Sequence, residues 1–220
     1  MSISEKKNNS SELDSAADTE KLLLARLESS TPGEDYFRWM LFVVGFYRGI
    51  NKISAATELL EAYIKTSKEV EQSAHCYLAL GQIATDAMHY DAALDHFMAA
   101  LELGPQKRKV VYVLHNNIGY CFNSLGRFEE GEKHCRTAIE IDWTRASAYR
   151  NLGVSLHGQK NVVASAWALV EAMNADEADG RARTLLEKLL ALHPLLGVEC
   201  PWVLRSLISD HTAASETPIM

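Results

Sequence analysis

A glycine that follows a branched aliphatic residue recurs through the middle of this 220-residue chain, with similar neighbours at each recurrence. The three glycines are Gly81, Gly119 and Gly153, at intervals of 38 and 34 residues. The residue sixteen positions later is apolar in each copy, and the residue nineteen positions later is alanine. Self-similarity at a period of roughly 20 to 50 residues is typical of solenoids, in which each unit packs only on its neighbours. The sequence therefore predicts a stack of similar units.

Each unit is expected to be a pair of antiparallel helices. Large and small residues recur at helical spacing on both sides of the glycine, and no alternating apolar and polar run indicates a strand. The turn between the helices falls about seven residues after the glycine, where Gly126 stands in one copy. The prolines lie between elements, where proline is tolerated. The sequence thus predicts an all-α chain.

The residues around these glycines resemble the tetratricopeptide repeat, whose usual period is 34 residues. The second unit departs from the family pattern at Gly131 and Trp143, where alanine and proline are usual. The resemblance implies an all-α, right-handed superhelix of about four helical hairpins with a C-terminal capping helix. The residues that match are Tyr77, Leu80, Gly81, Ala93, Phe97, Ala100 and Pro105 in the first unit, Gly119, Phe122, Gly126, Phe128 and Ala138 in the second, and Tyr149, Leu152, Gly153 and Ala172 in the third.

A degenerate repeat is expected before these three. Gly45 stands 36 residues before Gly81, and the apolar residues of its second helix, including Ala56 and Leu60, are one residue out of register. The 38-residue interval holds four extra residues, which predict either a first helix about one turn longer or a basic loop. The cations at 107–109 are then either a solvated helix start or an anion site.

The chain is expected to divide into a polar tail, a repeat domain and a second tail. The first residues are polar and of low complexity, which favours disorder. A terminal cap is needed because the last repeat would otherwise expose its apolar side. The expected boundaries are a disordered tail at 1–19, a repeat domain at 20–204 and a flexible tail at 205–220, with repeats at about 36–70, 74–107, 108–145 and 146–178 and the cap at about 179–204.

Composition excludes several classes of partner and compartment. The 29 acidic and 22 basic residues give a net charge of −7, which does not favour nucleic acid or an anionic membrane surface. The longest apolar run, at 39–46, is far shorter than the roughly 20 residues of a membrane span. The N-terminus lacks the apolar core of a secretory signal. The four cysteines form no CxxC pair, so we expect reduced thiols in a cytoplasmic protein.

The sequence predicts no catalytic residue, no metal site and no cofactor. His75, His89 and His96 are 14 and 7 residues apart, which is not the spacing of metal ligands on one helical face. The chain has no nucleophile elbow, no phosphate-binding loop and no zinc-protease motif. We therefore expect a protein that is not an enzyme.

Stacked hairpins present their first helices along a concave groove. Four asparagines fall on this face, although asparagine is a mediocre helix former. Amide and guanidinium groups on a rigid wall can bond a peptide backbone or a carboxylate. The alternative is that asparagine is merely tolerated on an exposed helix. The predicted partner-binding residues are Gln82, Asn116, Asn117, Tyr120, Asn123, Arg150 and Asn151.

The resemblance implies a protein–protein interaction adaptor that binds a partner peptide or segment in this groove without catalysis. The clamp that some family members use for the acidic tails of heat-shock chaperones needs lysines, and here only Asn117 or Asn151 has a match. Toward residues 39–46 the groove is apolar, unless the leucine-rich helix that begins at Glu20 covers it. Two alternatives are a secretion-type chaperone that holds an unfolded client and a self-assembling structural scaffold. Either alternative predicts a homo-oligomer.

Overall fold

The computed structural model describes residues 3–176 and 180–208, with side chains described from residue 15 onward. Every regular element in these ranges is an α-helix. The predicted all-α fold is therefore confirmed for this part of the chain. The helices are α1 (Ile3–Ser29), α2 (Glu34–Gly49), α3 (Ile53–Thr66), α4 (Val70–Asp86), α5 (Tyr90–Glu102), α6 (Arg108–Ser124), α7 (Phe128–Ile141), α8 (Ala146–Gly158), α9 (Val162–Ala175), α10 (Gly180–Leu192), α11 (Leu196–Glu199) and α12 (Pro201–Ile208).

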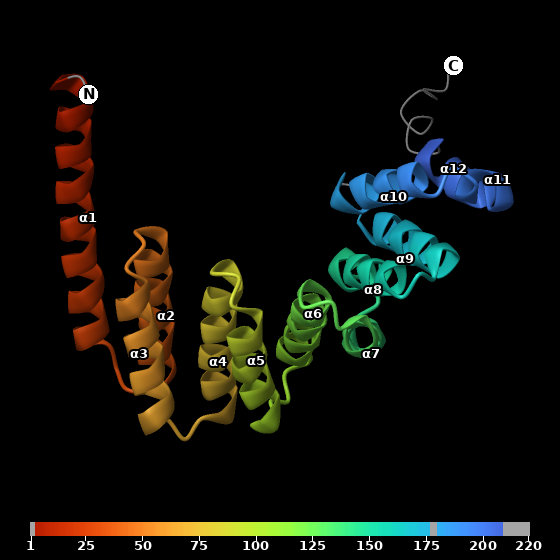
Figure 1. Ribbon diagram of the computed structural model, residues 1–220. Helices are drawn as coiled ribbons and strands as arrows, with labels where there is room; N and C mark the ends of the chain where they lie inside the picture. Colours follow the sequence, from red (N-terminus) through yellow and green to blue (C-terminus); the bar gives the residue numbers. More distant parts are fainter. Residues whose placement is uncertain (1–2, 177–179, 209–220) are drawn as a thin grey trace, which may run out of the picture.

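Helices α2 to α9 form four antiparallel hairpins, and α10 to α12 follow them. Figure 1 shows the hairpins side by side in a curved row, with α1 at one end and α10 to α12 at the other. The core consists of successive layers: Met40, Leu60 and Cys76 lie in one cluster that joins α2, α3 and α4. At the other end, Leu186 and Val203 pack with Leu169 of α9. The predicted superhelix of about four hairpins with a C-terminal cap is confirmed.

All four hairpins turn at a residue with a left-handed backbone. These residues have φ between 59° and 74°. The N–H of Met88, for example, donates to the carbonyl of Thr85 at 2.9 Å, and the next N–H donates to the carbonyl of Ala84 at 2.8 Å. This pair of bonds satisfies carbonyls at the end of the first helix, as in a Schellman cap. The turns predicted about seven residues after Gly81, Gly119 and Gly153 therefore lie where expected, although only one of them has glycine at this position. The four residues are Asn51, Met88, Gly126 and Lys160.

The recurring glycines lie where the two helices of a hairpin approach most closely. A Cβ on Gly119 would be 2.6 Å from the Cys135 sulfur, and a Cβ on Gly153 would be 2.8 Å from the Leu169 side chain. A Cβ on Gly81 would overlap the Phe97 ring. These partners are the apolar residues sixteen positions after each glycine. The repeated pattern therefore has a direct cause, because only glycine allows this approach.

The first hairpin has a different register from the one predicted. Gly45 is exposed, and a Cβ there would have no neighbour within 4 Å. Val44 is buried, and the left-handed Asn51 follows it by seven residues, as Met88 follows Gly81. The fully buried Ala56 follows Val44 by twelve residues. The prediction that Gly45 marks this repeat is therefore wrong: Val44 occupies the glycine position.

The extra residues of the 38-residue interval lengthen α6. Gly119 is the twelfth residue of α6, whereas Gly153 is the eighth residue of α8. Helix α6 is therefore about one turn longer than α8, as predicted, but it does not project beyond α4, in which Gly81 is also the twelfth residue. At the start of α6 the Glu71 carboxylate accepts hydrogen bonds from the backbone N–H groups of Gln106 and Lys107, at 2.5 and 3.2 Å. An internal carboxylate thus occupies the position where an anion would bind.

Both predicted tails are partly helical. Residues 3–19, expected to be disordered, lie in α1. The packed leucines near Leu27 stabilise the C-terminal part of α1. Because no glycine or proline occurs before Pro32, the helix can extend from there toward the N-terminus. A salt bridge of 2.6 Å joins Glu20 of α1 to Lys52, the residue before α3. Residues 205–208 belong to α12, and the rest of the expected tail, 209–220, lies outside the described residues.

The four cysteines are free thiols, and three of them are buried: Cys76, Cys121 and Cys135. Burial raises the pKa of Cys76 to about 12, so this thiol is protonated at neutral pH. Among the described residues, no helix is long and apolar enough to cross a membrane.

Candidate groove across α6, α8 and α10

A groove of about 670 Å³ lies across α6, α8 and α10. Six of the seven predicted partner-binding residues line it. Gln82 is the exception, because it lies one repeat earlier, in α4, where it is half-buried. The remaining lining residues are mostly small polar or cationic. The groove residues are Asn116, Asn117, Tyr120, Asn123 and Ser124 from α6, Ser147, Arg150, Asn151 and Val154 from α8, and Arg181, Thr184, Leu185 and Lys188 from α10.

Helix α10 forms a wall of the groove that was not predicted, because this helix was expected to act only as a cap. Its groove residues begin at Arg181 and recur three, four and seven positions later, ending at Lys188. That spacing places side chains on one face of an α-helix. The sequence therefore contained a signal for a third helical wall of the groove.

Asn151 joins α8 to α6. Its side-chain N–H group donates to the Asn116 side-chain oxygen at 3.1 Å and to the Asn116 carbonyl at 3.3 Å. The Asn116 amide N–H in turn donates to the side-chain oxygen of Asn117 at 3.3 Å. These asparagines therefore hold two successive first helices together.

A second set of bonds continues this connection along the same two helices. The Asn123 side-chain N–H donates to the Asn151 carbonyl at 2.8 Å, and the Ser155 hydroxyl donates to the Asn123 side-chain oxygen at 2.7 Å. We call Asn116, Asn123, Asn151 and Ser155 the amide ladder. The sequence predicted that these amides form hydrogen bonds with a partner, but most of their hydrogen-bonding groups are already paired within the protein. Among the described residues, the side-chain N–H group of Asn117 makes no hydrogen bond, and Asn117 lines the groove.

The groove carries positive charge in an acidic chain. Arg150, Arg181 and Lys188 line it, and no carboxylate lines it within the part of the chain that the structure describes. The chain as a whole has a net charge of −7. Arg150 and Arg181 also make interactions within the protein. A cleft lined by charges of one sign attracts ligands of the opposite sign.

A smaller apolar pocket of about 220 Å³ adjoins the groove between α8, α9 and α10. Val154, Leu185 and Lys188 line both spaces. The pocket is otherwise lined mainly by apolar groups. Its remaining lining residues are Gly153, His157, Ser165, Leu169, Leu189 and Leu192.

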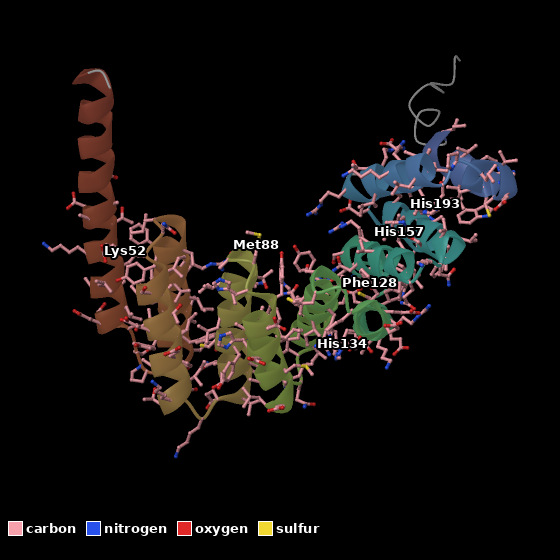
Figure 2. The ribbon with its side chains drawn as sticks, viewed as in Figure 1. Lys52, Met88, Phe128, His134, His157 and His193 are labelled. Carbon is pink, nitrogen blue, oxygen red and sulfur yellow. The ribbon has the colours of Figure 1, made fainter. Side chains whose placement is uncertain are left out.

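Two histidine pairs link neighbouring helices. The His157 and His193 side chains point toward each other, with their Nε2 atoms 3.3 Å apart (Figure 2). The Nδ1 atoms of His115 and His134 are 3.0 Å apart. Burial lowers the pKa of His134 to about 4, with a further contribution from His115, so this ring is neutral at pH 7. Within the described ranges, no three metal-ligating side chains gather into a site.

At the N-terminal end, α1 covers part of the apolar surface that was a candidate anchor site. Leu27 is buried in the first core cluster, and Trp39 and Phe46 pack against that cluster half-buried. Phe42 remains 56% exposed. The leucine-rich helix therefore covers this surface only in part.

Stacked helical hairpins with a groove along their first helices define the class of helical repeat proteins. Within that class, the hairpins of this chain resemble tetratricopeptide repeats. The family model of the tetratricopeptide repeat matches residues 112–142, which span most of α6 and α7.

Curated relatives match part of the chain. Over 88 residues it is 30% identical to response regulator aspartate phosphatase J of Bacillus subtilis (strain 168), covering 39% of this chain and 24% of that protein. Over 124 residues it is 22% identical to response regulator aspartate phosphatase I of the same organism, covering 54% and 31%. The chain thus spans about a quarter to a third of the length of these relatives.

Solved structures share the fold at low sequence identity. MamA from Desulfovibrio magneticus RS-1 superposes with a TM-score of 0.62 at 14% identity, over 83% of this chain and 99% of that chain. The first tetratricopeptide-repeat domain of Spaghetti (RPAP3), bound to the HSP90 peptide SRMEEVD, superposes with a TM-score of 0.50 at 18% identity, over 54% and 91%. At these identities the similarity shows the fold alone.

Proposed function

We propose that this chain is a non-catalytic interaction adaptor that binds a segment of a partner protein in the groove across α6, α8 and α10. The observation that carries this proposal is the convergence of side chains from three successive helices on one groove of about 670 Å³. A groove of this size with several polar groups is typical of a binding site.

The amide ladder supports binding indirectly. Its hydrogen bonds hold α6 and α8 in fixed relative positions. A preformed groove lowers the entropic cost of binding, because its side chains are already ordered. The groups left to contact a partner are the Asn117 N–H group, Lys188 and the ring of Tyr120, which is 41% exposed.

The comparisons include both a protein that is bound to a peptide and proteins that are named phosphatases. The Spaghetti domain shares this fold and is bound to a peptide. The Bacillus relatives are named phosphatases, but the chain spans only about a quarter to a third of their length. We therefore assign to this chain a binding role and no bond-making or bond-breaking step.

Photocrosslinking from the groove tests the proposal without knowledge of the partner. A photoreactive benzophenone amino acid replaces Tyr120 in the groove, or Trp167 in α9 as the matched control. Both are aromatic and similarly exposed, at 41% and 45%. After irradiation in lysate, a discrete protein adduct is expected from position 120 and a much weaker one from position 167. Equal adducts from the two positions would contradict the groove assignment.

The chaperone and scaffold alternatives predict self-association. Light scattering over a range of protein concentrations separates them from the adaptor. An adaptor keeps one mass at all concentrations, whereas an end-to-end scaffold grows as concentration rises.

A further inference from the structure

We propose that the groove accepts an acidic segment of the partner and that one large apolar side chain of this segment enters the pocket between α8, α9 and α10. The proposal rests on the proposed function of the groove and adds the chemistry of the partner. Two observations support it: the charge of the groove lining and the apolar pocket beside it.

The charge of the lining selects an anionic partner. Among the described residues, three cationic side chains and no carboxylate line the groove, although acidic residues outnumber basic ones in the chain. Charge of one sign in a cleft concentrates ligands of the opposite sign and disfavours those of the same sign. Because Arg150 and Arg181 also make contacts within the protein, Lys188 is the cation that we choose for the test.

The adjoining pocket selects an apolar group, because its polar atoms already have partners. The buried Ser165 hydroxyl donates to the Gly153 carbonyl at 2.7 Å. The His157 ring nitrogen is paired with His193 at 3.3 Å. What remains facing the pocket is largely aliphatic, from Leu169, Leu185 and Leu189 among others. Its volume of about 220 Å³ is sufficient for one large side chain, since a cavity of roughly 150 Å³ holds benzene.

The two spaces share a wall, which restricts the arrangement of the partner segment. Val154, Leu185 and Lys188 line both the groove and the pocket. The aliphatic part of a lysine packs on apolar surface while its ammonium group stays in polar surroundings. Lys188 can therefore contact a carboxylate in the groove beside an apolar side chain in the pocket. The acidic and apolar residues of the partner are accordingly expected to be close in sequence.

Fluorescence anisotropy with defined peptides tests this chemistry. The probe is a labelled eight-residue peptide with two glutamates on each side of a central leucine. A second peptide has serine in place of the leucine, and a third has lysines in place of the glutamates. We expect the leucine–glutamate peptide to bind, the serine peptide to bind about tenfold more weakly, and the lysine peptide not to bind. An unlabelled single-stranded oligonucleotide is expected to compete poorly, because it has no side chain for the pocket.

Two pairs of variants assign the binding to the two spaces. Lys188→Glu is expected to weaken binding of the leucine–glutamate peptide at least tenfold, whereas the charge change in the exposed control Lys133→Glu leaves it unchanged. Leu192→Ser is expected to weaken it severalfold. Its control is Leu195→Ser, because Leu195 is equally exposed, at 67% against 66%, but does not line the pocket. Circular dichroism confirms that each variant is folded.

Several results would overturn the inference. These are equal binding of the leucine and serine peptides, binding of the lysine peptide, full competition by the oligonucleotide, or no response to Lys188→Glu. An absence of binding by all three peptides would also overturn it. If photocrosslinking at position 120 still captures a partner in that case, the groove keeps its proposed function and only the chemistry inferred for the partner is wrong.

Discussion

Replacing Gly119 with alanine tests whether close helix approach explains the repeated glycines. The added Cβ would lie 2.6 Å from the sulfur of Cys135 and 3.2 Å from the carbonyl oxygen of Gly131. Non-bonded heavy atoms are comfortable at about 3.5 to 4 Å, so α6 and α7 must separate by several tenths of an ångström or more. Because the carbonyl oxygen belongs to the backbone, a side-chain rotation cannot relieve the whole contact.

The expected cost follows from two opposing effects. Overpacking a close contact costs about 1 to 3 kcal/mol. Alanine recovers about 0.5 to 1 kcal/mol because it loses less conformational entropy than glycine in a helix. The net destabilisation of Gly119→Ala is therefore up to about 2.5 kcal/mol, which lowers the melting temperature of a chain this size by up to about 10 °C.

Gly45→Ala provides the matched control. Gly45 also lies inside a helix, but a Cβ there would meet nothing within 4 Å. Only the helix-propensity effect remains, so this variant is expected to gain about 0.5 to 1 kcal/mol. Thermal and urea unfolding followed by far-ultraviolet circular dichroism measures both. If Gly119→Ala is stabilised as Gly45→Ala is, the close-approach explanation is refuted.

A double variant identifies the contact responsible. Cys135→Ala removes the sulfur that the new Cβ would meet at 2.6 Å. The two changes should then be less destabilising together than the sum of their separate effects, because residues in contact are not additive. If the two changes in unfolding free energy simply add, the strain lies elsewhere in the hairpin.

Three further predictions concern pH, turns and the amide ladder. Burial lowers the pKa of His134 from 6.5 to about 4, so the unfolded chain binds more protons in that interval. The contribution of His134 to the free energy of unfolding should therefore be complete above pH 6.5 and fall by about 1 to 2 kcal/mol toward pH 4. Urea titrations at several pH values measure this fall, which should be smaller in His134→Gln. Met88→Gly should raise the free energy of unfolding by about 1 kcal/mol, and Gly126→Ala should lower it by a similar amount, because both positions have positive φ. A lower melting temperature for Met88→Gly, or a higher one for Gly126→Ala, would contradict this. Asn151→Ala should cost about 1 to 3 kcal/mol in urea unfolding, because it removes the bonds to Asn116 and leaves polar atoms without partners, and an unchanged midpoint would count against the ladder.

The fold could be predicted because its determinants are local and repeated. The glycines and the apolar residues sixteen positions later contact each other directly, as between Gly119 and Cys135. Such a pair has a fixed offset in sequence, so it recurs visibly. The first hairpin broke this rule, because Val44 stands where the other hairpins have glycine, and the adjacent Gly45 suggested a register one residue too late. The left-handed backbone of Asn51 and the burial of Val44 and Ala56 give the correct register.

The groove was predictable in part. The faces of α6 and α8 followed from counting around the glycines, which is why Asn117, Tyr120 and Arg150 were found. The wall from α10 was missed because this helix was interpreted only as a cap, so the spacing of Arg181, Thr184, Leu185 and Lys188 on one helical face was not used. The bonds of the amide ladder were also beyond sequence reasoning. Asn151 and Asn116 are 35 residues apart, and their contact depends on how two repeats stack.

The amide ladder and the groove cations are expected to contribute to binding in different ways, and this difference links the fold to the proposed function. Asn151 bonds to α6 and shapes the groove, so Asn151→Ala should lower both stability and the affinity for the acidic peptide. Lys188 is exposed on α10, so Lys188→Glu should lower affinity at nearly constant stability. Comparing unfolding free energies with anisotropy titrations separates the two roles. If Asn151→Ala weakens the fold but leaves affinity intact, the order of the groove does not depend on the ladder, and the asparagines are purely structural.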